Sequence, residues 1–204
     1  MKLYGCPFTR TIRVTWALEE AGLPYEYIKV DLAKGETRQP EYLKLNPAGK
    51  VPTLVDGDLV LSESAAICNY IGALAPESRL VPSQPKERAI YDKWCFFVMS
   101  ELEKTVATVS GHSSTLPEKW RVPAVIETAK WEFANVLSVL IEGLGTNEFI
   151  AGDHFTAADI LLSQTLAWAL SRKLPIENEA VLAYRKRMFA RPAFQRAKDR
   201  ETKA

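Results

Sequence analysis

The sequence predicts a two-part fold, a small mixed α/β region followed by a longer all-helical one. Strand-like and helix-like segments alternate up to residue 75, whereas apolar residues recur only at helical spacing beyond residue 86. Residues 76–85 contain three prolines and two serines, which interrupt this periodicity. We therefore predict a first domain at residues 1–78, a linker at 79–85 and a helical domain at 86–204.

Composition indicates a folded globular protein that finds its partners through a local site. The 204 residues are 47% hydrophobic, enough for a sizeable core, and 26 basic residues balance 25 acidic ones. A net charge of +1 creates no broad field for nucleic acid or an anionic membrane, so we expect neither as a partner. No stretch approaches the 18 apolar residues of a membrane span, and we expect a cytoplasmic protein.

The cysteines and histidines do not form a recognisable metal or disulfide pattern. Cys6, Cys68 and Cys95 lie far apart, and His112 and His154 share no ligand spacing with them. An odd, scattered set of cysteines is typical of reduced thiols, and we expect no metal cofactor. Cys68 and Cys95 have apolar neighbours and are interpreted as small core residues.

The first region begins with a strand, a helix and a second strand. Residues 2–5 are a short apolar strand, and residues 9–21 repeat apolar side chains at helical spacing until Gly22. Residues 25–32 are β-branched and aromatic. Because a helix joins the two strands, we expect them to be parallel.

A hairpin and a helix complete this region. Residues 51–61 hold two apolar runs around Asp56-Gly57, a dipeptide that favours a two-residue hairpin turn. A crossover through residues 40–45 precedes them, and a helix at 63–74 follows. The predicted order βαβαββα is that of a thioredoxin-like domain.

The second region is predicted to be a helical bundle. Thr156 and Asp159 form a variant of the capping box, in which each side chain satisfies a free N–H of the first turn. We interpret this motif as structural, the start of a buried helix. The expected helices are residues 86–111, 118–143, 156–170, 177–188 and 192–198.

Taken in order, these features resemble the cytosolic glutathione transferase family over nearly the whole chain. The strings that carry the resemblance are Leu3-Tyr4-Gly5, residues 46–54 (NPAGKVPTL), Asp56-Gly57, residues 61–67 (LSESAAI) and Thr156-Ala157-Ala158-Asp159. The resemblance implies glutathione as co-substrate, a homodimer and a role in detoxification.

The resemblance also implies where glutathione is held. A cis peptide before Pro52 would let the backbone of Val51 pair with the cysteinyl unit, although a strand beginning at proline is the plainer interpretation. Glu63 and Ser64 would hold the γ-glutamyl end at a helix amino terminus, where an ordinary helix cap is the alternative.

Two cations are candidates for the glycyl carboxylate of glutathione. The resemblance points to Lys50 and Arg38, because the family usually places a cation near each position. Either could equally be a solvated surface charge, and Gln39 is a polar alternative beside Arg38.

The catalytic residue is expected just after the first strand, where the family places a Tyr, Ser or Cys that stabilises the thiolate. Counting back from the helix selects Phe8, which cannot donate a hydrogen bond, and counting forward from Gly5 selects Thr9. Thr9 is our first candidate, with helix N-capping as its alternative. Cys6 is the second, because Cys-Pro-Phe-Thr resembles a redox motif.

The predicted function is a glutathione transferase that conjugates the glutathione thiolate to small apolar electrophiles. One alternative is a non-catalytic binding or regulatory module of the same fold, favoured by Phe8 at the expected position. The other is a glutathione-dependent thiol-disulfide oxidoreductase that acts through Cys6.

Overall fold

A computed structural model describes residues 1–203 of the chain, which pack as two compact units. The first unit joins residues 1–81 to residues 190–203, and the second comprises residues 82–189. The predicted linker at 79–85 contains the point where the chain passes from one unit to the other.

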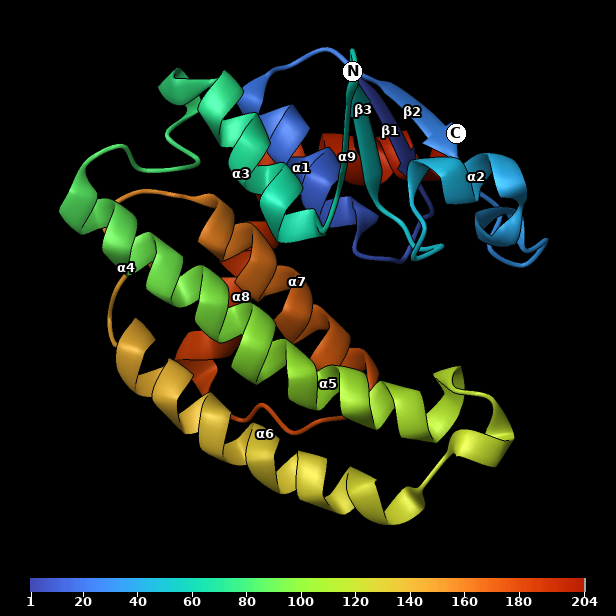
Figure 1. The fold of residues 1–204 in the computed structure, drawn as a ribbon. Helices are drawn as coiled ribbons and strands as arrows, with labels where there is room; N and C mark the ends of the chain where they lie inside the picture. The colour runs from blue at the N-terminus through green and yellow to red at the C-terminus, as the bar shows by residue number, and fades with distance from the viewer. Residues whose placement is uncertain (204) are drawn as a thin grey trace. The chain divides into compact units, whose positions relative to one another are not determined.

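A four-stranded mixed sheet organises the first unit (Figure 1). Its strand order is β2-β1-β3-β4, with β1 and β2 parallel and the other pairs antiparallel, as predicted. Helix α1 provides the crossover between β1 and β2. The bounds are β1 (Lys2–Gly5), α1 (Thr11–Ala21), β2 (Glu26–Lys29), η1 (Glu36–Arg38), α2 (Pro40–Leu45), β3 (Thr53–Asp56), β4 (Leu59–Ser62), α3 (Ser64–Leu74) and η2 (Pro76–Ser78).

Local chemistry explains where these elements end. Gly57 has φ +59° in the β3–β4 turn, which confirms the predicted hairpin. Strand β2 is shorter than the predicted 25–32, because Asp31 Oδ1 accepts hydrogen bonds from the backbone N–H groups of Ala33 and Lys34 and so starts a turn. Gly5 is required because a Cβ there would lie 2.2 Å from Thr11 Cγ2.

Helices cover both faces of the sheet, with α1, α3 and α9 on one face and α2 beside the other (Figure 1). Helix α9 (Pro192–Lys203) was predicted as part of the helical domain at 86–204, and instead it packs against α1. The Phe194 ring meets Trp16 edge to face at 4.9 Å, and Arg191 pairs with Glu20 at 2.6 Å. These contacts explain why the last helix belongs to the first unit.

The second unit is all helical, as predicted. Helix α6 begins at Pro123, a residue suited to a first helical turn, whereas the predicted start at residue 118 is a separate 3₁₀ turn. Its elements are α4 (Pro85–Phe96), the π-helical η3 (Phe97–Leu102), α5 (Glu103–Ser110), the π-helical η4 (Gly111–Thr115), η5 (Glu118–Trp120), α6 (Pro123–Leu144), α7 (Ala157–Ser171) and α8 (Glu179–Phe189).

The predicted capping box is confirmed at the start of α7. Asp159 Oδ2 accepts the backbone N–H of Thr156 at 2.8 Å, and Asp159 Oδ1 accepts the Tyr184 hydroxyl at 2.7 Å and the backbone N–H of Ile150 at 2.9 Å. Burial raises the pKa of the Asp159 carboxyl, against the effect of these donors. The motif therefore ties α7 to α8 and to the preceding loop.

Candidate functional site

The sheet register brings the candidate binding segments to one end of the first unit. Tyr4 pairs with Thr53 and Thr53 pairs with Ser62, so the end of β1, the start of β3 and the end of β4 meet. The chain beyond these points comprises the loop before α1, the Val51-Pro52 peptide and the amino end of α3. Segments separated by more than forty residues in sequence thus share one edge.

The main chain of Val51 is available to a ligand. The Val51–Pro52 peptide is cis, as the family resemblance implied, and Pro52 is buried immediately before β3. Within residues 1–203, neither the N–H nor the C=O of Val51 has a hydrogen-bond partner. A half-buried residue with both groups free can pair with an extended peptide.

The preceding residue, Lys50, is fixed through its carbonyl. That oxygen accepts the Tyr42 hydroxyl at 2.7 Å and the Asn46 amide at 2.8 Å, and Thr53 approaches it at 3.5 Å. Tyr42, Asn46 and Thr53 are all buried. This network sets the backbone at Lys50 and leaves its side chain exposed.

Arg38 is held close to the same loop. Its Nη1 donates to the carbonyl of Ala48 at 3.3 Å, and a Cβ on Gly49 would lie 2.6 Å from that nitrogen. Gly49 also has φ +59°, so the position favours glycine for two reasons. Arg38 and Lys50, twelve residues apart in sequence, become two exposed cations of one loop cluster.

The amino end of α3 is open to an anion. Glu63 precedes the helix with φ +70°, a conformation uncommon for a residue with a side chain, and no described side chain caps the first turn. The free N–H groups and the helix dipole favour a carboxylate at this point. Glu63 is exposed and Ser64 is buried, 3% exposed.

A buried cation lies behind this helix terminus. Arg13 of α1 is fully buried, and its Nη1 donates to Ser64 Oγ at 3.2 Å. Cys68 also contacts α1, through a 3.6 Å bond from Sγ to the carbonyl of Arg13. The positive charge of Arg13 thus adds to the helix dipole at the Ser64 position.

The loop before α1 contains a closed ring of hydrogen bonds. The N–H of Cys6 donates to Thr11 Oγ1 at 3.2 Å, and Thr9 Oγ1 donates to the carbonyl of Cys6 at 2.7 Å. Since the single Thr9 proton is used there, Thr11 must donate in the 2.8 Å contact between the two hydroxyls. Thr9 Oγ1 also accepts the N–H of Thr11, the first residue of α1, at 3.2 Å. The N-cap position is Arg10, not Thr9, and no described side chain makes a capping bond there.

Phe8 and Cys6 have contrasting environments within this loop. Phe8 is 97% exposed and has φ +63°, so its ring points into solvent with a backbone conformation unusual for an aromatic residue. Cys6 is partly buried, and burial raises the pKa of its thiol, with smaller contributions from Asp31 and Glu201. The Cys6 thiol is therefore held mainly in its protonated form.

Comparison with known families matches both units. The model of the glutathione S-transferase N-terminal domain matches residues 1–73, and that of the C-terminal domain matches residues 98–192. A relative from Zea mays, "Glutathione S-transferase 3", is 34% identical over 96% of this chain and 92% of its own length. The chain belongs to the glutathione S-transferase family.

Further relatives support this family from sequence and from structure. "Glutathione S-transferase GST-4.5" of Xanthomonas campestris is 33% identical over 93% of both chains. A solved sphingomonad glutathione S-transferase, complexed with glutathione, shares 30% identity with a TM-score of 0.87 and covers 100% of both chains.

Several residues of this glutathione S-transferase site were missed from sequence. Arg13, Tyr42 and Asn46 position the candidate binding residues, but helical periodicity assigns them only to helices or their ends. The contacts of the buried arginine and of the tyrosine directed at a neighbouring loop can be assigned only once the sheet register is known.

Among the residues described, no group of three or more His, Cys, Asp or Glu side chains could hold a metal ion, and no helix is long and apolar enough to cross a membrane.

Proposed function

We propose that this chain binds glutathione at the shared end of β1, β3 and β4 and conjugates its thiolate to small apolar electrophiles. One observation carries the proposal: a free backbone pair at Val51, an open helix amino end at Ser64 and two cations, Arg38 and Lys50, occur together. An extended tripeptide with a carboxylate at each end has the complementary arrangement of groups.

Each part of glutathione has a proposed partner. The γ-glutamyl carboxylate meets the α3 N–H groups and Ser64, and Glu63 takes the ammonium side. The N–H and C=O of the cysteinyl unit pair with Val51, whose geometry depends on Pro52. The glycyl carboxylate lies near Lys50 and Arg38. This order directs the thiol toward the loop before α1.

The proposed reaction is a nucleophilic attack by the glutathione sulfur. The thiol loses its proton to solvent, the thiolate forms a carbon–sulfur bond, and the leaving group departs with the bonding electrons. For an epoxide or an enone, the electrophile instead takes up a proton. We propose Thr9 as the donor that stabilises the thiolate. Its hydroxyl must then stop donating to the carbonyl of Cys6 and donate to the glutathione sulfur instead.

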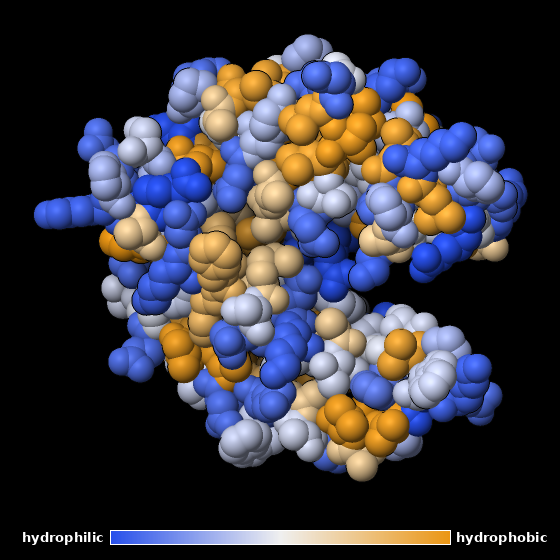
Figure 2. Space-filling model, in the orientation of Figure 1, coloured by the Kyte–Doolittle hydropathy of each residue, from blue (hydrophilic) through white to orange (hydrophobic). Residues whose placement is uncertain are grey.

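A homodimer is proposed for the native protein. The support is apolar surface that a monomer would leave in water: Leu59 and Val60 of β4 are 38% and 42% exposed, and Leu74 of α3 is 43% exposed. Figure 2 shows an apolar patch over the strands of the first unit. Sedimentation equilibrium should give twice the chain mass. A monomer at micromolar concentration would exclude the homodimer without affecting glutathione binding.

We also propose detoxification of apolar electrophiles in the cytoplasm as the setting of the reaction. Cys6, Cys68 and Cys95 form no disulfide with one another, which suits a reducing compartment. A panel of aryl halides, epoxides and enones, each assayed with glutathione, would identify the electrophile class.

The decisive experiment compares wild type with Thr9→Val, Thr9→Ser and Cys6→Ser. Loss of one donor to the developing thiolate should lower kcat/KM of Thr9→Val at least tenfold, on the scale of an oxyanion donor, and Thr9→Ser should retain activity. Cys6→Ser should conjugate at the wild-type rate. Full turnover by Thr9→Val would refute the role of Thr9, and loss of all activity in Cys6→Ser would favour thiol-disulfide exchange.

A further inference from the structure

Helix α9 buries an acid that no cation neutralises. Glu201 is 3% exposed, and its Oε1 accepts the hydroxyl of Thr15 at 2.8 Å. No Lys or Arg among residues 1–203 forms an ion pair with it. Carboxylates are rarely buried without a partner, since removing a charge from water is costly. Burial raises the pKa of the Glu201 carboxyl to about 7.

Two other titratable groups lie near this carboxyl. The hydroxyl of Tyr27 is buried and has no hydrogen-bond partner in the described part of the chain. Burial raises the pKa of Tyr27, and the charge of Glu201 adds to that effect. The pKa of Cys6 is likewise raised by burial first, with contributions from Asp31 and Glu201, while Lys29 lowers it. Glu201 therefore acts on groups from β2 and from the loop after β1.

Four cations on or beside α9 already have partners of their own. Arg196 pairs with Glu19 at 2.9 Å, and Lys203 pairs with Asp199 at 3.0 Å. Arg191 pairs with Glu20 on α1, and Arg200 lies over the Tyr25 ring, 5.4 Å from its centroid. None of these cations compensates Glu201.

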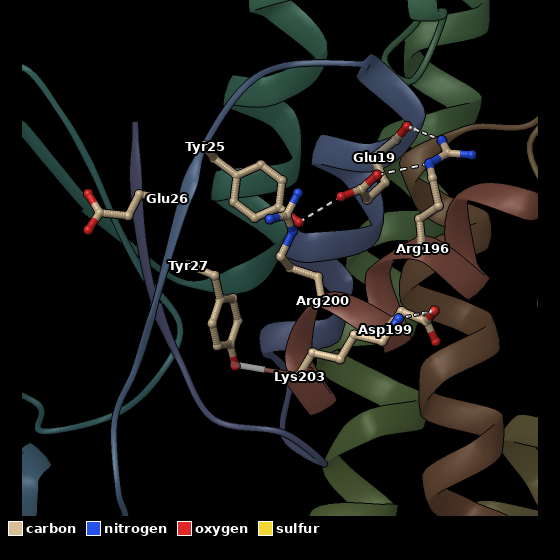
Figure 3. Close-up of a pocket in the computed structure, with 8 residues that line it drawn as sticks. All are labelled: Glu19, Tyr25, Glu26, Tyr27, Arg196, Asp199, Arg200 and Lys203. Atoms are coloured by element: carbon tan, nitrogen blue, oxygen red, sulfur yellow. Dashed lines mark hydrogen bonds and ion pairs between the residues drawn. The ribbon is translucent and has the colours of Figure 1, made fainter.

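A pocket of about 710 Å³ adjoins this interface (Figure 3). Tyr25 and Tyr27 extend toward α9 in this view, and Arg200 lies against Tyr25. Arg196 reaches instead to Glu19, and the Lys203 amine to Asp199. None of the candidate glutathione-binding residues lines the pocket. Since Tyr27 lines it and also lies near Glu201, the pocket brings solvent close to the interior that holds the carboxyl.

Helix α1 connects Glu201 to the candidate catalytic loop. Thr15, which donates to Glu201, also approaches the carbonyl of Thr11 at 3.2 Å. Thr11 in turn binds the N–H of Cys6 and the hydroxyl of Thr9. Thr15 and Thr11 lie one turn apart on α1, so the turn that carries the Glu201 contact also carries the side chain that holds the loop.

We propose that Glu201 is a positioning residue for the Cys6–Thr9 loop, and that the proton on its carboxyl sets the electrostatic environment of the loop. With the carboxyl neutral, Glu201 adds no charge to the interior beside the loop. When the carboxyl loses its proton to solvent, a negative charge appears there and disfavours a second anion at Cys6. The reactivity of the Cys6 thiol consequently depends on the protonation of Glu201, a residue from the other end of the chain.

Alkylation of Cys6 tests this coupling without glutathione, so its outcome is independent of the proposed function. Iodoacetamide labelling, quantified on the Cys6 peptide by mass spectrometry, is measured from pH 5.5 to 9 for wild type and Glu201→Gln. At pH 8, Glu201→Gln should react about threefold faster, the order expected for removing one nearby charge. At pH 5.5, where the wild-type carboxyl is neutral, the two rates should converge.

The matched control is Asp199→Asn, which removes an exposed charge from the same helix. It should follow the wild-type profile at every pH. Superimposable profiles for wild type and Glu201→Gln would overturn the proposal, as would an equal acceleration in Asp199→Asn. Should Glu201→Gln fail to fold, carbon-13 NMR of the wild-type carboxyl decides the question: a midpoint near pH 7 supports the proposal, and a midpoint below 5.5 refutes it.

Discussion

Arg13 of α1 donates a hydrogen bond to Ser64 of α3 at 3.2 Å, and both residues lie in the interior of the first unit. The contact joins the two helices whose amino ends meet at the candidate glutathione site. It also places a permanent positive charge behind the helix terminus that we assign to the γ-glutamyl carboxylate. The core and the binding site therefore share one side chain.

Replacing this cation should weaken glutathione binding. Arg13→Met removes the charge and leaves Ser64 Oγ without this donor, so we expect about a tenfold loss of glutathione affinity. Calorimetric titration with glutathione measures this loss of affinity. The control is Arg191→Met, which breaks an ion pair with Glu20 in the same unit and should leave the affinity unchanged. Equal effects of both variants would mean that Arg13 acts only through general stability.

The hydroxyl of Tyr42 should support binding indirectly, because it fixes the carbonyl of Lys50 next to Val51. Tyr42→Phe should weaken glutathione binding by about 1 kcal/mol, the usual net value of one hydrogen bond. Tyr70→Phe is the matched control, since it loses a 2.8 Å bond to Asp56 at the hairpin. Similar losses in the two variants would show that Tyr42 has no specific role.

Replacing Lys50 or Arg38 should weaken binding only of ligands that carry a free glycyl carboxylate. Lys50→Gln and Arg38→Gln should each lower glutathione affinity about threefold to tenfold, and the loss should diminish at high salt. Lys44→Gln, an exposed charge on α2, should have no effect. Glutathione esterified at glycine should bind all four proteins similarly. A full effect of Lys50→Gln on the ester would contradict the assignment.

Glu201 should make stability fall as pH rises. The pKa of the Glu201 carboxyl is raised from 4.5 to about 7 in the folded protein. The contribution of this residue to the free energy of unfolding is therefore fully present below pH 4.5 and is lost as pH passes through 7. Glu201→Gln should match wild type at pH 4.5 and exceed it by about 3 kcal/mol above pH 8, given 1.4 kcal/mol per pKa unit. Urea unfolding at several pH values measures the difference. A constant difference at all pH values would exclude titration of this carboxyl as the cause.

Local sequence signals predicted most of the fold. The Asp56-Gly57 turn, the helix that enforces parallel strands and the Thr156–Asp159 box each depend on neighbouring residues, and the structure contains all three. The placement of α9 was not predictable in this way, because it depends on Phe194 meeting Trp16 from the opposite end of the chain. Helical periodicity identifies a buried face and carries no information about its partner.

The candidate site was predicted unevenly for the same reason. Val51 and Ser64 belong to short motifs with a direct physical meaning, and Arg38 came from the family resemblance. The uncertainty between Phe8 and Thr9 arose because the helix length did not fix its first residue; α1 begins at Thr11. The catalytic role of Thr9 stays a prediction, since its proton is engaged with Cys6.

Titration of glutathione into wild type and into a Glu63→Ala/Ser64→Ala double variant tests whether the amino end of α3 holds glutathione. We expect measurable binding by wild type and at least a tenfold loss in the variant, because the γ-glutamyl carboxylate would lose a hydroxyl partner and an oriented helix terminus. A variant with the same secondary structure by circular dichroism and the same affinity as wild type would contradict this expectation.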